Sequence, residues 1–222
     1  MGHLSDLQTE YGKKGLNVIA LTGEGRDVNL RYMVHNDSGF RYKVGIGGGG
    51  AYGVTGVPHA YLIDAEGIVR WEGSPSSLSG KTIEGYLKQV KPLDQAEMDR
   101  RAQKMLDLGE SLAADKLFVR AEQQFERVAQ AYPKADAAEK AKARAKEMRE
   151  GDNKAEYDAQ ASIAKLVGGP EAPDPNAKKL KGKQIEAAAK KLAKMADDLA
   201  SETPRAAKLA SEWATIFSTP WE

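Results

Sequence analysis

The chain has 222 residues, of which 29% are charged, yet its formal net charge is only +1 and it contains no cysteine. The balanced charge excludes the overall basic field of a typical nucleic-acid-binding protein. The lack of cysteine excludes disulfides, thiol catalysis and Cys-ligated metal sites within these residues. No apolar run approaches the ~20 residues of a membrane-spanning helix, and no signal-peptide pattern is present. We therefore expect neither a membrane span nor a signal in this chain.

Composition changes along the chain. Seventeen of the 22 glycines precede residue 86, whereas alanine, lysine and glutamate dominate afterwards. This shift predicts an α/β unit followed by an all-helical unit, and we place the domains at residues 1–92 and 93–222. The length is sufficient for each unit to bury a core of its own.

The first elements are predicted from hydrophobic spacing. Leu4, Leu7 and Tyr11 recur at the interval of one helix face, which predicts an amphipathic helix over residues 1–11. Gly15 is a typical C-terminal cap for that helix. The apolar run at residues 16–21 predicts a buried parallel strand.

Further short elements follow up to Pro92. A helix is expected over residues 26–36, with Leu30 and Val34 facing inward. We also expect a short extended piece at 40–44, a hairpin of strands at 60–63 and 68–71, and a closing helix at 81–90. These elements complete the predicted α/β unit.

The most informative stretch is YGVTGVPHAYLID, residues 52–64. Pro58 stands at the mouth of an apolar strand, where a missing N–H is tolerated, and X-Pro is the bond at which cis geometry costs least. This stretch closely resembles the cis-proline segment of thioredoxin-fold proteins, particularly the TlpA-like exported thiol-disulfide oxidoreductases and redoxins. In that family Tyr-Gly-Val-x-Gly-x-Pro precedes an apolar strand and Asp-x-x-Gly. The resemblance implies a thioredoxin-like fold for residues 1–92.

The resemblance also implies an activity and an origin. The family performs thiol-disulfide exchange in the cell envelope through a Trp-Cys-x-x-Cys motif, which this chain lacks. Met1, His3, Leu4 and Leu7 match the family's active-site helix just after that motif, with Gly2 in place of a proline. We therefore expect a truncated version of a longer, exported protein, and enzyme activity only if that longer form carries the cysteines. Catalytic residues cannot be assigned within this chain.

Truncation at that point would leave a gap in the sheet. In the thioredoxin fold the strand before the motif lies between those matching residues 16–21 and 60–63. Both neighbours would then expose unpaired backbone groups at their edges. Two alternatives are that the gap closes or that a second chain fills it.

The candidate binding site is the substrate-side wall formed by Val57, Pro58 and His59. In the family, the residue before the cis-proline offers its backbone N–H and C=O to an extended peptide, as in strand addition. His59 stands where relatives usually carry threonine, and in a complete domain it would influence the pKa of nearby thiols. A half-exposed histidine at a strand start is the alternative. A protein without cysteines would still bind extended segments here, as a non-enzymatic module.

No cofactor or metal site is expected. The histidines are far apart in sequence, and peroxide reduction would need a Thr/Ser-x-x-Cys motif that is absent. The glycines at 47–50 lack the context of a phosphate-binding loop. Asp64 and Glu66 fit turn chemistry better than paired-carboxylate catalysis. The lysines between 178 and 183 are expected to form a solvated helix start rather than a nucleic-acid site.

The region after Pro92 resembles helical repeats. Two long helices are predicted within 94–149, separated near Tyr132 and Pro133. The stretch RAEQQFERVAQAYPKADAAEKA resembles a tetratricopeptide-type hairpin, which implies a protein partner on this unit. A similar pattern of apolar and alanine residues recurs 67 to 69 positions later, about twice the ~34-residue repeat. Residues 168–176 are a predicted linker, and Thr203 with Pro204 is a predicted helix start.

Overall fold

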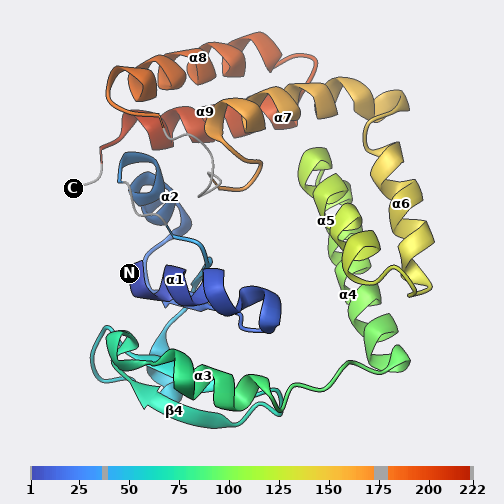
Figure 1. Cartoon of the computed structure of the whole chain (residues 1–222). Coiled ribbons are helices and arrows are strands. Elements are labelled where there is room, and N and C mark those ends of the chain that lie inside the picture. The colour runs from blue at the N-terminus through green and yellow to red at the C-terminus, as the bar shows by residue number, and fades with distance from the viewer. Residues whose placement is uncertain (1, 37–39, 173–179, 221–222) are drawn as a thin grey trace. The chain divides into compact units, whose positions relative to one another are not determined.

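The computed structural model describes residues 2–36, 40–172 and 180–220, and the side chains of residues 49 and 51 are not described. The chain divides into two compact units (Figure 1). The first comprises Met1–Asn29 and Asn36–Pro92, and the second comprises Leu30–His35 and Leu93–Glu222. Part of one N-terminal helix therefore belongs to the second, helical unit.

Among the described residues, the chain up to Pro92 contains short helices and four strands, and all of these residues except 30–35 belong to the first unit. In chain order these are α1 (Gly2–Tyr11), a 3-10 turn (Gly12–Lys14), β1 (Ile19–Thr22), α2 (Arg26–His35), β2 (Lys43–Ile46), a 3-10 turn (Gly49–Tyr52), β3 (Ala60–Ile63), β4 (Val69–Gly73), a 3-10 turn (Pro75–Ser77) and α3 (Gly80–Leu87). Each element predicted here is present, although several boundaries move. The strand predicted from residue 16 begins only at Ile19, and the extended piece predicted at 40–44 is a strand from Lys43.

The strands form two separate sheets. β1 pairs with β2 in parallel, with Ile19 opposite Lys43, and β3 pairs with β4 in antiparallel, with a bulge at Leu62/Ile63. No pairing joins β1 to β3 in the part of the chain that the structure describes. The predicted gap is thus present there, and the alternative in which these strands close it by pairing is not observed.

A small core holds the hairpin against the helices. Leu7 and Tyr11 of α1 pack with Leu62 of β3 and with Leu78 and Ile83 at and near α3. The spacing of Leu7 and Tyr11 is the helix period used in the prediction, and both are buried. β3 is therefore positioned by α1 and α3.

The parallel sheet is much less covered. Ile19 is 62% exposed and Leu21 is 56% exposed. A parallel pair is normally covered by its crossover helix, here α2. The buried residues of α2, Leu30 and Val34, instead belong to a core of the helical unit. The apolar side chains of Ile19 and Leu21 remain exposed, so this strand is parallel as predicted, but the prediction that it is buried was wrong.

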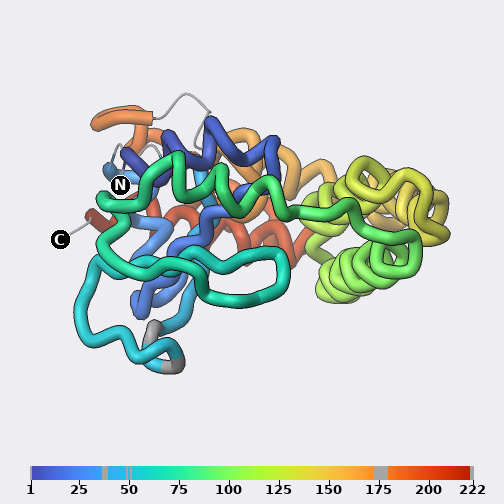
Figure 2. Tube along the Cα trace, turned by 60° about the horizontal axis from the view of Figure 1, so that its bottom comes forward, coloured from blue at the N-terminus to red at the C-terminus, as the bar shows by residue number. Residues whose placement is uncertain are grey.

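The second unit contains six further α-helices among the described residues. These are α4 (Gln95–Ala114), α5 (Phe118–Ala131), α6 (Ala137–Glu147), α7 (Lys154–Val167), α8 (Lys183–Leu199) and α9 (Pro204–Ser218), with a 3-10 turn (Gly151–Asn153) before α7. One core joins α4, α5 and α6, which lie side by side in Figure 2. A second core joins α7, α8 and α9 with residues 30–35 of α2.

The first of the two long helices predicted after residue 94 was wrong, because it is broken into two. The structure ends the first helix of the second unit at Ala114 and begins α5 at Phe118, so three helices replace the two predicted within 94–149. Lys116 has a left-handed backbone with φ of 55°. The N–H of Lys116 bonds to the carbonyl of Ala113, and that of Leu117 to the carbonyl of Leu112. This is the Schellman ending, which usually uses glycine and here uses lysine.

Other predicted boundaries fared differently. The break near Tyr132 and Pro133 is confirmed, since α5 ends at Ala131. Pro204 is the first residue of α9, as predicted, but the hydroxyl of Thr203 donates to the carbonyl of Leu199 and does not cap the helix. Residues 173–176 of the predicted linker, Lys178, Lys179 and Met1 lie outside the described residues.

Candidate functional site

The predicted wall lies in an exposed segment directly before β3. The Val57–Pro58 peptide bond is cis, and β3 begins two residues later at Ala60. Val57 is 90% exposed, and Pro58 and His59 are exposed as well. Within the described residues, no hydrogen bond uses the backbone N–H or C=O of Val57. These two groups are therefore available to an incoming chain.

Three aromatic rings adjoin this segment. The ring centroids of His59 and Tyr61 are 4.9 Å apart, and those of Tyr61 and Tyr52 are 5.4 Å apart. The Tyr61 hydroxyl donates to the Tyr52 carbonyl at 2.7 Å. We call Tyr52, His59 and Tyr61 the aromatic row. Of these three residues, only His59 was predicted as part of the site. The i, i+2 spacing of His59 and Tyr61, typical of side chains that share a strand face, could have indicated Tyr61 as well.

The turn after β3 fixes the hairpin that carries the wall. The Asp64 carboxylate accepts the N–H groups of Glu66 and Ile68, both at 2.9 Å, and Arg70 Nε at 2.6 Å. Its side chain is only 4% exposed. The N–H of Ile68, followed by the Arg70 guanidinium, lowers the pKa of Asp64 below its ordinary value. The prediction that Asp64 serves turn formation is confirmed.

Helix α1 is tied to the same unit by polar contacts. His3 Nε2 lies 2.8 Å from the Leu78 carbonyl, and the Tyr11 hydroxyl donates to Glu84 Oε1 at 3.2 Å. Burial, together with hydrogen bonding to neighbouring glutamates, raises the pKa of Tyr11 to about 12. His3 thus has a structural contact in α1 and is not part of the wall.

Each histidine has contacts of its own. His35 Nε2 lies 3.4 Å from the Ile216 carbonyl inside the helical unit, whereas His59 stacks on Tyr61. Among the described residues, no group of three or more His, Asp or Glu side chains is arranged to hold a metal ion.

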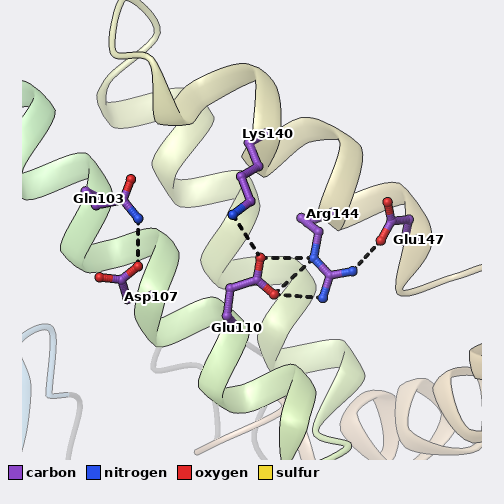
Figure 3. Close-up of polar contacts among 6 residues, drawn as sticks. All are labelled: Gln103, Asp107, Glu110, Lys140, Arg144 and Glu147. Atoms are coloured by element: carbon purple, nitrogen blue, oxygen red, sulfur yellow. Dashed lines mark hydrogen bonds and ion pairs between the residues drawn. The ribbon is translucent and has the colours of Figure 1, made fainter.

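The helical unit carries paired charges between its helices. Glu110 of α4 accepts Arg144 Nε at 3.0 and 3.1 Å and Arg144 Nη2 at 2.7 Å (Figure 3). Arg144 also pairs with Glu147 and lies over the Phe125 ring, 5.7 Å from its centroid. Lys140 Nζ is 3.8 Å from Glu110. Because these charges neutralise one another, we interpret them as a brace between α4 and α6.

A second charged group, around the buried carboxylate of Glu122, joins α5 to α7. The Tyr157 hydroxyl donates to Glu122 at 2.5 Å, and Arg149 pairs with both Glu122 and Glu126. Burial, followed by the hydrogen bond to Glu122, raises the pKa of Tyr157 to about 12. This group also fixes helices, because each of its polar side chains is bonded to another.

An open groove of about 390 Å³ runs between α5 and α6. Ala129 and Ala145 contribute small side chains to its lining. The lining also has charges of both signs, because Lys146 pairs with Glu150 and Arg149 pairs with Glu126. The helices of the described residues include none with the length and apolar character of a membrane span.

A cis-proline before an antiparallel hairpin, supported by α1 and α3, is the arrangement expected of a thioredoxin-like redoxin. Sequence comparison shows that part of the chain is related to this family. The relatives are thiol-disulfide oxidoreductases ResA from Bacillus thuringiensis (strain Al Hakam) and Bacillus anthracis, each 33% identical over 96 residues. A third, from Bacillus thuringiensis subsp. konkukian, is 30% identical over the same length.

These alignments cover 41% of this chain and 54% of each relative. The chain therefore spans about half the length of the curated relatives that it matches. No family model matches the chain, and no solved structure matches it.

Proposed function

We propose that residues 1–92 provide the substrate-side wall of a thiol-disulfide oxidoreductase. The observation that carries this proposal is the free, exposed backbone of Val57 beside cis-Pro58, within a chain related to proteins of that activity. An extended substrate segment would pair with the N–H and C=O of Val57, adding a short strand. The 222 residues hold no cysteine, so the exchanging thiols would come from outside them.

His59 would act beside those thiols. Thiol-disulfide exchange requires a thiolate, and a cationic or hydrogen-bonding imidazole nearby stabilises one. His59 is exposed directly after Pro58, on the same face as Tyr61. We therefore assign Val57 and Pro58 to substrate binding and His59 to the environment of the reacting sulfur.

A second candidate is a non-enzymatic peptide-binding module. It is favoured by the absence of cysteine from the 222 residues, because pairing with Val57 requires no thiol. Thiol content and insulin reduction by the protein from its native source distinguish the two candidates. Two thiols and turnover support the oxidoreductase, whereas binding without thiols supports the module.

We further propose that residues 120–141, which form most of α5 and the start of α6, are a tetratricopeptide-like hairpin that packs on α4 and docks a protein partner. Leu108-Gly109, Ala121-x-x-x-Phe125 and Pro133 occur in the order of that repeat's pattern. A Cβ on Gly109 would lie 2.4 Å from the Phe125 ring, so glycine permits the close approach of the two helices. The groove between α5 and α6, with alanines and side chains of both charges in its lining, is the proposed surface for the partner.

The wall can be tested by titrating the ¹⁵N-labelled 222-residue chain with an uncharged, extended peptide. We expect the amide signals of Val57 and His59 to shift. Val57→Pro removes the donating N–H and should weaken binding by about 5- to 10-fold, the effect of losing one net hydrogen bond of ~1 kcal/mol. Val57→Ala, which keeps the N–H, should bind normally. Equal binding by the two variants, with unchanged melting temperatures, would contradict the wall.

A further inference from the structure

The aromatic row has geometry suited to stacking. Its ring separations of 4.9 and 5.4 Å lie within the ~4.5–7 Å range of favourable aromatic pairs. The planes are tilted by 57° and 36°. The hydrogen bond from Tyr61 to the Tyr52 carbonyl holds the 3-10 turn Gly49–Tyr52 against β3. The row is therefore held in place before any ligand arrives.

The row does not serve the core of its unit. None of its three side chains belongs to the cluster around Leu7, Leu62 and Ile83. Tyr52 is 53% exposed, and His59 is exposed too. Its outer rings consequently retain surface that an aromatic or apolar group can cover.

The surrounding segment is free of fixed charge. From Gly45 to Ile63 the chain has no Asp, Glu, Lys or Arg. An ionic side chain of a bound peptide would find no counter-charge within this segment. The nearest charge that the strand pairing places beside the row is Glu72, which lies opposite Tyr61 on β4. Within the segment itself, recognition depends on backbone pairing and on contact with the rings.

The aromatic row lies next to Val57 along the chain, so a peptide paired with Val57 would lie beside its rings. Val57 lies in the bend just before β3, and in paired extended chains opposite side chains stand about 4.5–5.5 Å apart. His59 and Tyr61 follow Val57 at steps of two residues, and their rings stack. A side chain next to the paired peptide residue would therefore reach the row.

We propose that the aromatic row selects extended peptide segments that carry an aromatic side chain beside the residue paired with Val57. The selection rests on the proposed wall, and it adds the chemistry of the substrate. The partner is an uncharged, extended segment with Phe, Tyr or Trp at that position. Stacking on the row supplies the preference, and pairing with Val57 supplies the register.

The test compares two uncharged extended peptides that differ only in a central Phe or Ala. Isothermal titration with the full 222-residue chain should show the Phe peptide binding about 2- to 10-fold more tightly, the usual gain of one aromatic pair. Raising the salt concentration should leave this ratio unchanged, because both peptides are uncharged and differ only in an apolar side chain. A ratio that collapses in high salt would overturn the stacking account.

Variants assign the preference to the row. Tyr52→Ala, which lies outside the wall, should lower the Phe/Ala ratio while leaving the affinity for the Ala peptide unchanged. His59→Thr should lower the ratio as well, whatever it does to the affinity for the Ala peptide, because it removes a ring of the row. Tyr61→Phe, which keeps the ring, should retain most of the ratio. A ratio of one in the unmodified chain, with both peptides bound, overturns the inference and leaves the wall standing. Failure of both peptides to bind overturns the wall and the inference together, and a preference that survives both ring removals overturns the inference alone.

Discussion

Asp64 shows how a single buried carboxylate shapes the segment that carries the wall. It accepts two backbone N–H groups within its own turn and one guanidinium N–H from Arg70. Gly67 completes this turn with φ of 82°, a conformation that favours glycine. The turn of the hairpin that begins at the wall is therefore formed by Asp64, Arg70 and Gly67, to which we assign no role in binding or catalysis.

The first prediction concerns Asp64→Asn and its dependence on pH. The pKa of Asp64 is lower in the folded chain than the unfolded value of about 3.9. A lowered folded pKa contributes stability above the unfolded pKa and loses it as the pH falls through the folded value. The variant should therefore melt below the wild type at pH 7, and the two melting temperatures should converge below pH ~4.

Circular dichroism melts between pH 7 and pH 2 measure this difference. Glu66→Gln is the matched control, since that exposed carboxylate lies 3.6 Å from the same Arg70 and should matter little. A difference between wild type and Asp64→Asn that stays constant with pH would show that the carboxylate charge plays no part.

At the scale of elements, two glycines in helices differ in what surrounds them. A Cβ on Gly109 of α4 would meet the Phe125 ring at 2.4 and 2.7 Å, and Phe125 is fully buried. A Cβ on Gly85 of α3 would have nothing within 4 Å. One glycine therefore serves packing, whereas the other only weakens its helix.

The second prediction follows from this contrast. Gly85→Ala should stabilise α3 by up to ~1 kcal/mol, the gain in helix propensity. Gly109→Ala makes the same gain, but overpacking against Phe125 costs about 1–3 kcal/mol, so the net effect should be destabilising. Thermal unfolding of both variants measures the signs. Two shifts of the same sign would show that the ring can move aside.

Elements were predicted where their signal is local. The spacing of Leu7 and Tyr11 indicated α1, and the turn residues after Ile63 indicated the hairpin. The break at Lys116 was missed because its left-handed residue is not glycine, and no proline follows. Where a helix ends at such a residue depends on tertiary packing, which cannot be read from a single sequence.

The candidate site was predicted in part for the same reason. Val57, Pro58 and His59 lie within one motif, so sequence alone located them. The contact of Tyr52 with Tyr61 depends on how the turn at Gly49–Tyr52 folds back on β3. That approach joins residues nine positions apart through a loop with no periodic pattern.

At the scale of the whole molecule, the two units are not consecutive in the chain. Leu30 and Val34 of α2 are buried in the core of α7, α8 and α9, and His35 contacts the Ile216 carbonyl. The helical unit therefore contains a segment that the chain supplies before β2. The composition shift near Pro92 did not indicate that part of α2 belongs to the helical unit.

The third prediction tests it by cutting the chain. A protease site introduced at Pro92–Leu93 should yield two fragments that co-elute in size-exclusion chromatography and separate only in denaturant, because α2 stays in the helical core. Leu30→Ala should weaken the association, since such a truncation in a core costs about 2–5 kcal/mol. If the fragments that retain Leu30 separate without denaturant, the shared core is contradicted.

In evolutionary terms, the shared core means that the helical unit cannot be transferred intact as one continuous stretch of the gene. A block encoding residues 93–222, moved elsewhere as a unit, would leave Leu30 and Val34 behind and expose the apolar surface that they cover. Substitutions that change side-chain volume in α8 or α9 would need matching changes in α2. We expect these segments to vary together in descent, although much of the chain separates them.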